Sequence, residues 1–152
     1  MTAPPVGTRL ARDLLLDADA VRDGARLVGD INPLHHDAAY AAASRFGGLI
    51  ASGAHTAAVL AGVISELIAE RGFGPAVGMD YQVRFLRPVH VGRRMRMEWR
   101  VAHVEPTRLG EIGRLEGRMV DAEDGSIAIT AAMHCLFFAE AERPEAGGAA
   151  VP

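Results

Sequence analysis

The chain contains no lysine, and all sixteen of its basic residues are arginine. A Schiff-base mechanism and a phosphate-binding P-loop both need a lysine side chain, so the sequence excludes both. The only cysteine, Cys135, cannot form an intramolecular disulfide and leaves no thiolate metal motif. Because Cys135 lies in an apolar run, we expect a small buried side chain rather than a nucleophile.

Long apolar runs and a basic excess are missing as well. No apolar stretch reaches the length of a membrane span without a Glu or Arg, and residues 1–6 lack the regions of a signal peptide. The formal net charge is −3, which argues against general nucleic-acid binding. We therefore predict a cytoplasmic protein that binds neither membranes nor nucleic acid.

The composition that remains is that of one globular domain. The chain has 152 residues, of which 49% are hydrophobic, and this is enough for a sizeable core. We expect residues 1–139 to form a single domain. Residues 140–152 are rich in Ala, Gly, Glu and Pro, so we expect a disordered tail.

The most informative segment is Gly-Asp-Ile-Asn-Pro-Leu-His-His-Asp at residues 29–37. Pro33 fixes its own φ and disfavours the α region at Asn32, so the segment should be a tight, structured loop. Such a loop can bring Asp30 and His35 to the same small pocket. A carboxylate and an imidazole placed around one water molecule are the groups that general acid–base catalysis requires.

Two other interpretations of this segment stay open. Asp and Asn before Pro are common turn formers and helix caps. His and Asp are also ligands of zinc and iron, but a second ligand cluster at metal spacing is missing, so we predict no metal site. The density of polar groups favours acid–base chemistry, since the loop combines two carboxylates, an amide and two of the six histidines of the chain.

A second block, residues 46–56, leads into the longest helical pattern of the chain. Ser52 is a candidate N-cap, and the free N–H groups of the first helical turn would favour a developing oxyanion. Gly53 would let a substrate carbonyl approach the backbone closely. We therefore predict that Ser52 and Gly53 bind substrate. The alternative is that glycines here only permit close helix packing.

The rest of the pattern predicts an α+β fold. We expect a strand at residues 9–16 and helices at 19–28, 38–46 and 53–71, the last apolar on nearly all sides and hence buried on most of them. Strands follow, separated by turn signals that include Pro106, and the last two form a hairpin; they lie at residues 77–85, 94–101, 109–120 and 127–138. One helix followed by consecutive antiparallel strands suits an α+β domain better than a parallel sheet.

The motif Gly29-Asp30-x-Asn32-Pro33-x-His35-x-Asp37 resembles the signature of the MaoC-like dehydratases, which include the (R)-specific enoyl-CoA hydratases. The resemblance covers roughly residues 21–139 and implies a hot-dog fold, a long central helix wrapped by an antiparallel sheet. It implies that Asp30 and His35 are catalytic and hold the reacting water. Asn32 would support the substrate site, and His36 would not be catalytic.

The resemblance extends to Gly53, whose N–H is implied to bind the thioester carbonyl; Ser52 stands where the family often has His. The implied activity is that of a hydro-lyase that reversibly hydrates a trans-2-enoyl thioester to the (R)-3-hydroxyacyl thioester. Coenzyme A or the phosphopantetheine of acyl carrier protein would be part of the substrate, with no other cofactor. The family fold also implies a homodimer. The alternatives are a hot-dog acyl thioesterase and a non-catalytic hot-dog protein that binds acyl thioesters.

Five arginines surround the Arg87-Pro88 turn: Arg84, Arg87, Arg93, Arg94 and Arg96. They could bind the phosphates of coenzyme A or of a carrier arm. We favour an ordinary solvated strand face, since exposed strand positions are commonly charged. The histidines outside the motif, which are His55, His90, His103 and His134, are expected to be structural.

Overall fold

The computed structural model describes residues 3–138, so the predicted tail at 140–152 lies outside the described residues. The elements in chain order are β1 (Arg9–Leu15), α1 (Ala18–Leu27), η1 (Pro33–His35), α2 (Ala38–Ala43), α3 (Gly53–Gly62), α4 (Ser65–Ala69), β2 (Ala76–Phe85), β3 (Arg94–Thr107), β4 (Gly110–Asp121) and β5 (Ile127–Phe138). Within this part of the chain, no helix is long and apolar enough to span a membrane.

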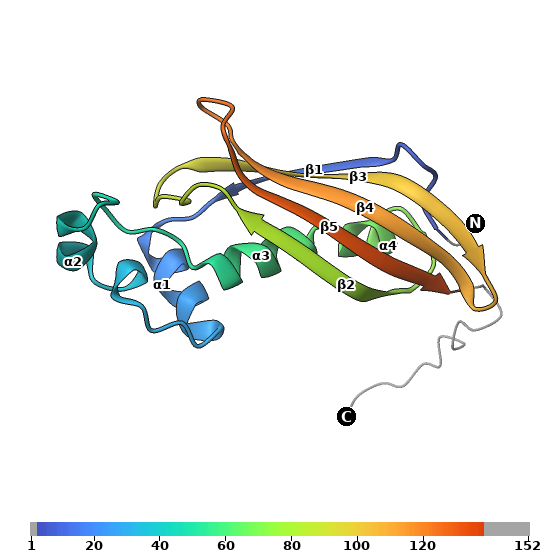
Figure 1. Cartoon of the computed structure of the whole chain (residues 1–152), viewed down its shortest axis with the longest axis horizontal. Helices are drawn as coiled ribbons and strands as arrows, with labels where there is room; N and C mark the ends of the chain where they lie inside the picture. The colour runs from blue at the N-terminus through green and yellow to red at the C-terminus, as the bar shows by residue number, and fades with distance from the viewer. Residues whose placement is uncertain (1–2, 139–152) are drawn as a thin grey trace.

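All five strands form one antiparallel sheet in the order β1-β3-β4-β5-β2. The sheet curves around α3 and α4, while α1 and α2 gather beyond one end of it (Figure 1). This is the predicted α+β hot-dog fold. The arrangement places the loop after α1 next to the start of α3, at the end of the sheet where the helices gather.

The core lies between the inner face of the sheet and the central helices. Successive side chains of a strand point to opposite faces, and in β3 the alternation places Met95, Met97, Trp99 and Val101 inside. Cys135 of β5 is buried, as predicted, and burial raises the pKa of its thiol to about 11. A thiol with so high a pKa is a poor nucleophile at neutral pH.

The predicted central helix at residues 53–71 is not continuous. It is interrupted at residues 63–64, between α3 and α4. There the Ile64 N–H bonds the Ala61 carbonyl three residues back, and the Ser65 hydroxyl donates to the carbonyl of Gly62 at 2.6 Å. Bonds of this short period and a competing side-chain donor both break the α-helical ladder.

Burial of this helix on most sides was also an overestimate. In α3 only Thr56 and Leu60 are buried, and Ala54 and Ala58 are exposed. The sheet covers a single face of α3, the face that carries Thr56 and Leu60. Small side chains on the remaining face produce an apolar pattern without contributing to the core of the chain.

The third strand is longer than predicted, because β3 continues through Pro106 to Thr107. Pro106 is therefore not a turn residue, and it pairs with Glu111 of β4. Val101 still bonds Gly7 and Thr8, just before β1, but beyond Val101 the only strand among residues 3–138 that pairs with β3 is β4. Proline is tolerated on such an edge because its missing N–H interrupts no ladder there.

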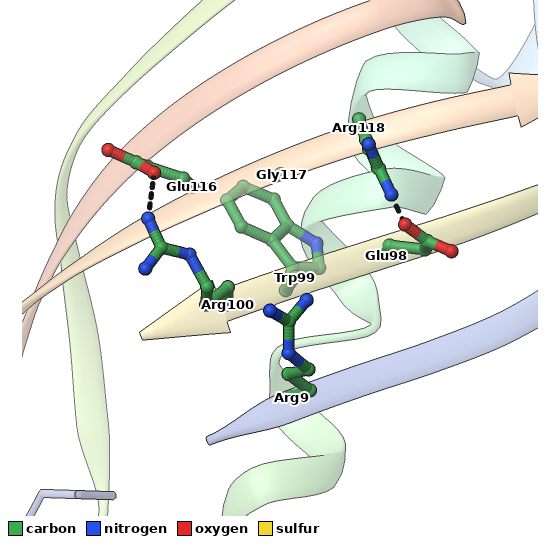
Figure 2. A pocket seen from close by; sticks show the side chains of 7 residues that line it. All are labelled: Arg9, Glu98, Trp99, Arg100, Glu116, Gly117 and Arg118. Carbon is green, nitrogen blue, oxygen red and sulfur yellow. Dashed lines mark hydrogen bonds and ion pairs between the residues drawn. The ribbon is translucent and has the colours of Figure 1, made fainter. Parts of the chain in front are cut away.

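One cross-strand contact explains a glycine in the middle of β4. Trp99 of β3 pairs with Gly117, and its side chain lies against β4 at that residue (Figure 2). Its indole N–H donates to the carbonyl of Leu60 at 2.7 Å, which fixes the ring against α3. A Cβ at Gly117 would lie 2.7–2.8 Å from three atoms of the ring. The missing side chain of Gly117 is what makes room for Trp99.

We expect Gly117→Ala to lower the free energy of unfolding by about 1–3 kcal/mol, because the ring cannot move without losing its bond to Leu60. Gly78→Ala in β2 is the matched control, since a Cβ there would meet only Met133, at 3.9 Å. Urea denaturation of both variants measures the difference. Equal stabilities for the two variants would contradict the assigned role of Gly117.

Candidate active site

The loop that carries the predicted acid–base pair begins with a glycine cap. Gly29 adopts a φ of 71°, and its N–H bonds the carbonyl of Arg26. The Asp30 N–H bonds the carbonyl of Ala25 at 2.8 Å. These two bonds are those of a Schellman motif, which ends α1 and fixes the backbone of Asp30.

Three polar side chains of the loop then act as turn formers and caps, as the alternative interpretation predicts. Asp30 Oδ1 accepts from the Asn32 N–H at 3.1 Å, and Asn32 Oδ1 accepts from the Leu34 N–H at 3.1 Å, where it caps η1. Asp37 caps α2 through the Tyr40 N–H. The oxygen of Asn32 is thus committed to the loop, and its role toward substrate stays a prediction.

The structure brings Asp30 and His35 into contact. Their side chains meet at 3.1 Å, between Nε2 of His35 and Oδ2 of Asp30. The other ring nitrogen, Nδ1, lies 2.7 Å from the carbonyl of Ile50, which can only accept, so Nδ1 carries a proton. Nε2 is thus the ring nitrogen that faces the carboxylate of Asp30. His35 is buried, whereas the Asp30 side chain is 29% exposed.

Ser52 occupies the N-cap position of α3 but makes no capping hydrogen bond with its side chain. Its hydroxyl instead donates to Oδ2 of Asp30 at 2.7 Å. Ser52 is therefore the N-cap residue, as predicted, but its hydroxyl binds the carboxylate of Asp30 and leaves the N–H groups of the first helical turn without a side-chain cap. The hydrogen bond from Ser52 is the main cause that lowers the pKa of Asp30. The Asn32 N–H and His35 lower it further, against partial burial, which raises it.

Gly53 is the first residue of α3, where a backbone N–H has no partner within its own helix. It lines a pocket of about 430 Å³ together with His35. A Cβ at Gly53 would lie 3.2 Å from two ring atoms of Phe85, so a side chain here would crowd the pocket wall. Asp30 is not part of this wall and meets the pocket through His35.

Sequence reasoning missed several residues of this pocket. Arg45 and Phe46 reach it from the α2–α3 loop, and Phe85 reaches it from the end of β2. Phe85 is far from the Asp-His motif in sequence, whereas Arg45 and Phe46 follow Asp37 after one short helix. The glycine-rich stretch that follows Phe46 was the signal nearest to them.

His36, which the resemblance implied is not catalytic, holds the loop together. Its Nε2 lies 2.6 Å from the carbonyl of Asp30. His55 of α3 packs on Gly24 of α1, where a Cβ would overlap the imidazole ring, and burial lowers the pKa of His55. His134 pairs with Asp80 at 2.9 Å. None of these three histidines lines the pocket beside Gly53.

Other depressions of the surface lack this combination of groups. One of about 380 Å³ lies over β1, β3 and β4 (Figure 2). It holds the ion pairs Arg100–Glu116 and Arg118–Glu98 and has no histidine in its wall. Within residues 3–138, no three His, Cys, Asp or Glu side chains group as metal ligands.

Comparison with solved structures identifies similar proteins. The (R)-hydratase from A. caviae involved in PHA biosynthesis is 25% identical, with a TM-score of 0.78 over 90% of this chain and 99% of that chain. The R-hydratase from Pseudomonas aeruginosa in its unliganded form is 24% identical, with a TM-score of 0.74 over 98% of this chain and 94% of that one. At 24% identity, the similarity to the Pseudomonas aeruginosa protein is evidence for a shared fold alone.

A complex of two different chains shares the fold as well. The HadBC 3R-hydroxyacyl-ACP dehydratase from Mycobacterium tuberculosis is 18% identical, with a TM-score of 0.75 over 90% of this chain and 99% of that chain. A comparison with curated proteins found no significant match. The MaoC like domain model matches residues 5–120, which is most of the chain, including both the Asp30 loop and Gly53. The chain therefore belongs to the MaoC-like domain family.

Proposed function

We propose that the protein is a hydro-lyase that reversibly hydrates a trans-2-enoyl thioester to the (R)-3-hydroxyacyl thioester. The observation that carries this proposal is the contact between Asp30 and His35, next to a pocket that also contains the first N–H of α3. Membership of the MaoC-like family and the similarity to an (R)-hydratase support it.

The two side chains suffice for the proton transfers that hydration needs. Asp30 is ionised at neutral pH, and its lowered pKa extends the ionised state to lower pH, so it takes the proton from water. The water oxygen then bonds to the β-carbon, and His35 Nε2 gives a proton to the α-carbon. Transfer of the new Asp30 proton to Nε2, across the 3.1 Å contact, restores the pair. No proton is gained or lost overall.

The negative charge that builds up on the thioester oxygen needs a donor. We assign the Gly53 N–H to it, because this group lies at the positive end of α3 and the residue lines the pocket. The predicted substrate-binding residues then have different roles. Gly53 would bind the carbonyl, Asn32 would keep the loop in shape, and Ser52 would hold Asp30.

The remaining parts of the proposal concern partners. The substrate would carry coenzyme A or phosphopantetheine, and acid–base chemistry needs no further cofactor. We propose a homodimer, which the edge of the sheet supports. Within the part of the chain that the structure describes, β2 pairs only with β5, and its exposed side chains include Val77, Met79 and Phe85. We place the protein in the cytoplasm.

The test is the loss of the conjugated enoyl absorbance of crotonyl-CoA in the presence of the protein. We expect Asp30→Asn and His35→Ala each to lower kcat/KM by about 10²–10⁴-fold, because each removes one of the two proton carriers. His103→Ala, at an exposed position of β3, is the control and should keep wild-type kcat/KM.

The outcomes of this assay are separable. Folded Asp30→Asn and His35→Ala proteins with near-normal turnover would refute the assignment of the pair. Release of free thiol without loss of the enoyl absorbance would show that the protein is an acyl thioesterase. If crotonyl-CoA binds but neither loses its enoyl absorbance nor releases free thiol, the protein is a non-catalytic hot-dog protein that binds acyl thioesters.

The pH dependence tests the hydrogen bond between Ser52 and Asp30. Activity needs ionised Asp30, so kcat/KM falls as the pH drops through the lowered pKa of this carboxyl. Ser52→Ala removes the main cause of the lowering, and the acid limb of the profile should therefore move to higher pH. Ser65→Ala, which alters a hydroxyl bonded only to the Gly62 carbonyl, is the matched control. If the acid limbs of wild type and Ser52→Ala superimpose, Ser52 does not set the pKa of Asp30.

A further inference from the structure

The arginines near the Arg87-Pro88 turn differ in what they contact. Arg93 is held by three carboxylates, at 2.7 Å from Asp121, 2.6 Å from Glu123 and 3.7 Å from Asp124. The hydrogen bond to Asp121 raises its pKa. An arginine neutralised by three acidic groups has little left for a ligand.

Arg96 is likewise committed to carboxylates. It lies 3.3 Å from Asp13 and 3.2 Å from Glu98, on the outer face of the sheet. Arg84 is exposed and lines a separate small depression formed by β2 and β5. For these two residues, the solvated strand face is the correct interpretation.

Arg87 and Arg45 are different. Both line the pocket that contains His35 and Gly53, and no carboxylate lines that pocket. Among residues 3–138, neither guanidinium has an ion-pair partner. In a chain with a net charge of −3, this pocket therefore carries a local excess of two positive charges. Unpaired guanidinium groups facing one cavity are suited to a phosphate, which they can bind bidentately.

The guanidinium of Arg45 and the backbone of Arg87 are each oriented by a contact that uses none of the guanidinium donors. The Arg45 guanidinium lies over the ring of Phe46, 5.6 Å from its centroid, and such a contact orients the group but leaves its N–H groups free. The Arg87 N–H bonds the carbonyl of Ala128 at 3.2 Å, and Pro88 follows it directly. The backbone of Arg87 is thus fixed, which lowers the entropic cost of binding.

Arg87 also stands where two depressions meet. Arg87 and Pro88 line both the pocket beside Gly53 and a neighbouring depression of about 490 Å³. A long substrate whose thioester lies at Gly53 therefore passes Arg87 if it extends into this second depression.

We propose that Arg45 and Arg87 form a subsite for the phosphate of the carrier arm of the thioester substrate. This inference rests on the proposed function for the position of the thioester. The chemistry recognised is a phosphate ester at the end of a pantetheine arm. Coenzyme A and the prosthetic group of acyl carrier protein both present it.

The test compares crotonyl thioesters of pantetheine, 4′-phosphopantetheine and coenzyme A as substrates of the full-length protein. We expect kcat/KM to be at least about tenfold higher with 4′-phosphopantetheine than with pantetheine, the size expected for one lost charge-assisted contact. Arg87→Gln and Arg45→Gln should each reduce this ratio several-fold, mainly through KM. Arg84→Gln removes the same charge outside the pocket and should leave the ratio unchanged.

The second phosphate source is distinguished in the same experiment. If 4′-phosphopantetheine performs as well as coenzyme A, the subsite recognises the phosphate common to both carriers. If kcat/KM is raised only for the coenzyme A thioester, and this increase depends on Arg45 and Arg87, the subsite binds the nucleotide phosphates of coenzyme A. An equal kcat/KM for all three thioesters, or a ratio unaffected by both variants, would overturn the subsite while the hydratase stands.

Calorimetric titration with coenzyme A and with pantetheine separates failure of the subsite from failure of the proposed function. Binding of coenzyme A that weakens at least about tenfold in Arg87→Gln or Arg45→Gln supports the subsite even if no thioester is hydrated. Equal binding by wild type and both variants, without hydration, would refute both proposals together.

Discussion

The arrangement of the whole site depends on a short stretch of extended backbone, residues 49–51. On one side, the Ile50 N–H bonds the Leu34 carbonyl, and the Ile50 carbonyl accepts from His35. On the other side, the Ala51 N–H bonds the Val89 carbonyl, in the connection between β2 and β3. The stretch thereby joins the Asp30 loop to the sheet, and Ser52, the N-cap residue of α3, follows it directly. Backbone bonds of this kind hold a site more rigidly than side-chain contacts alone.

The position of Ser52 links the acid–base pair to the start of α3. An ordinary N-cap serine would accept a hydrogen bond from the first helical turn. Here its hydroxyl donates to Asp30 and makes no such bond, which leaves the first-turn N–H groups of α3 available. The same hydrogen bond lowers the pKa of Asp30. A single departure from the usual cap therefore serves both halves of the proposed chemistry, the carboxylate that takes a proton and the donors for a negative oxygen.

The sequence predicted the features that depend on local pattern. The alternation of β3, the glycine and proline signals of the Asp30 loop and the hairpin of β4 and β5 are all present in the structure. The partner of Ser52 could not be predicted, because Asp30 lies 22 residues away and the contact exists only in the folded chain. The break between α3 and α4 was missed for a related reason. The apolar pattern continues through it, while the change is in the hydrogen-bond period of the backbone.

The pairing of charged side chains could not be predicted from the sequence either, because it too depends on contacts in the folded chain. On the outer face of the sheet, acidic and basic side chains alternate across strands, and Arg118 and Arg96 both bind Glu98 and lower its pKa. Such pairs cancel one another and are individually worth little at an exposed surface. The net charge and the isoelectric point are sums over the whole chain. They therefore give no sign of a pocket whose wall contains Arg45 and Arg87 and no acidic residue. Local imbalance, rather than net charge, is what an anionic substrate would encounter, and it becomes visible only when each arginine is assigned its partner in the folded structure.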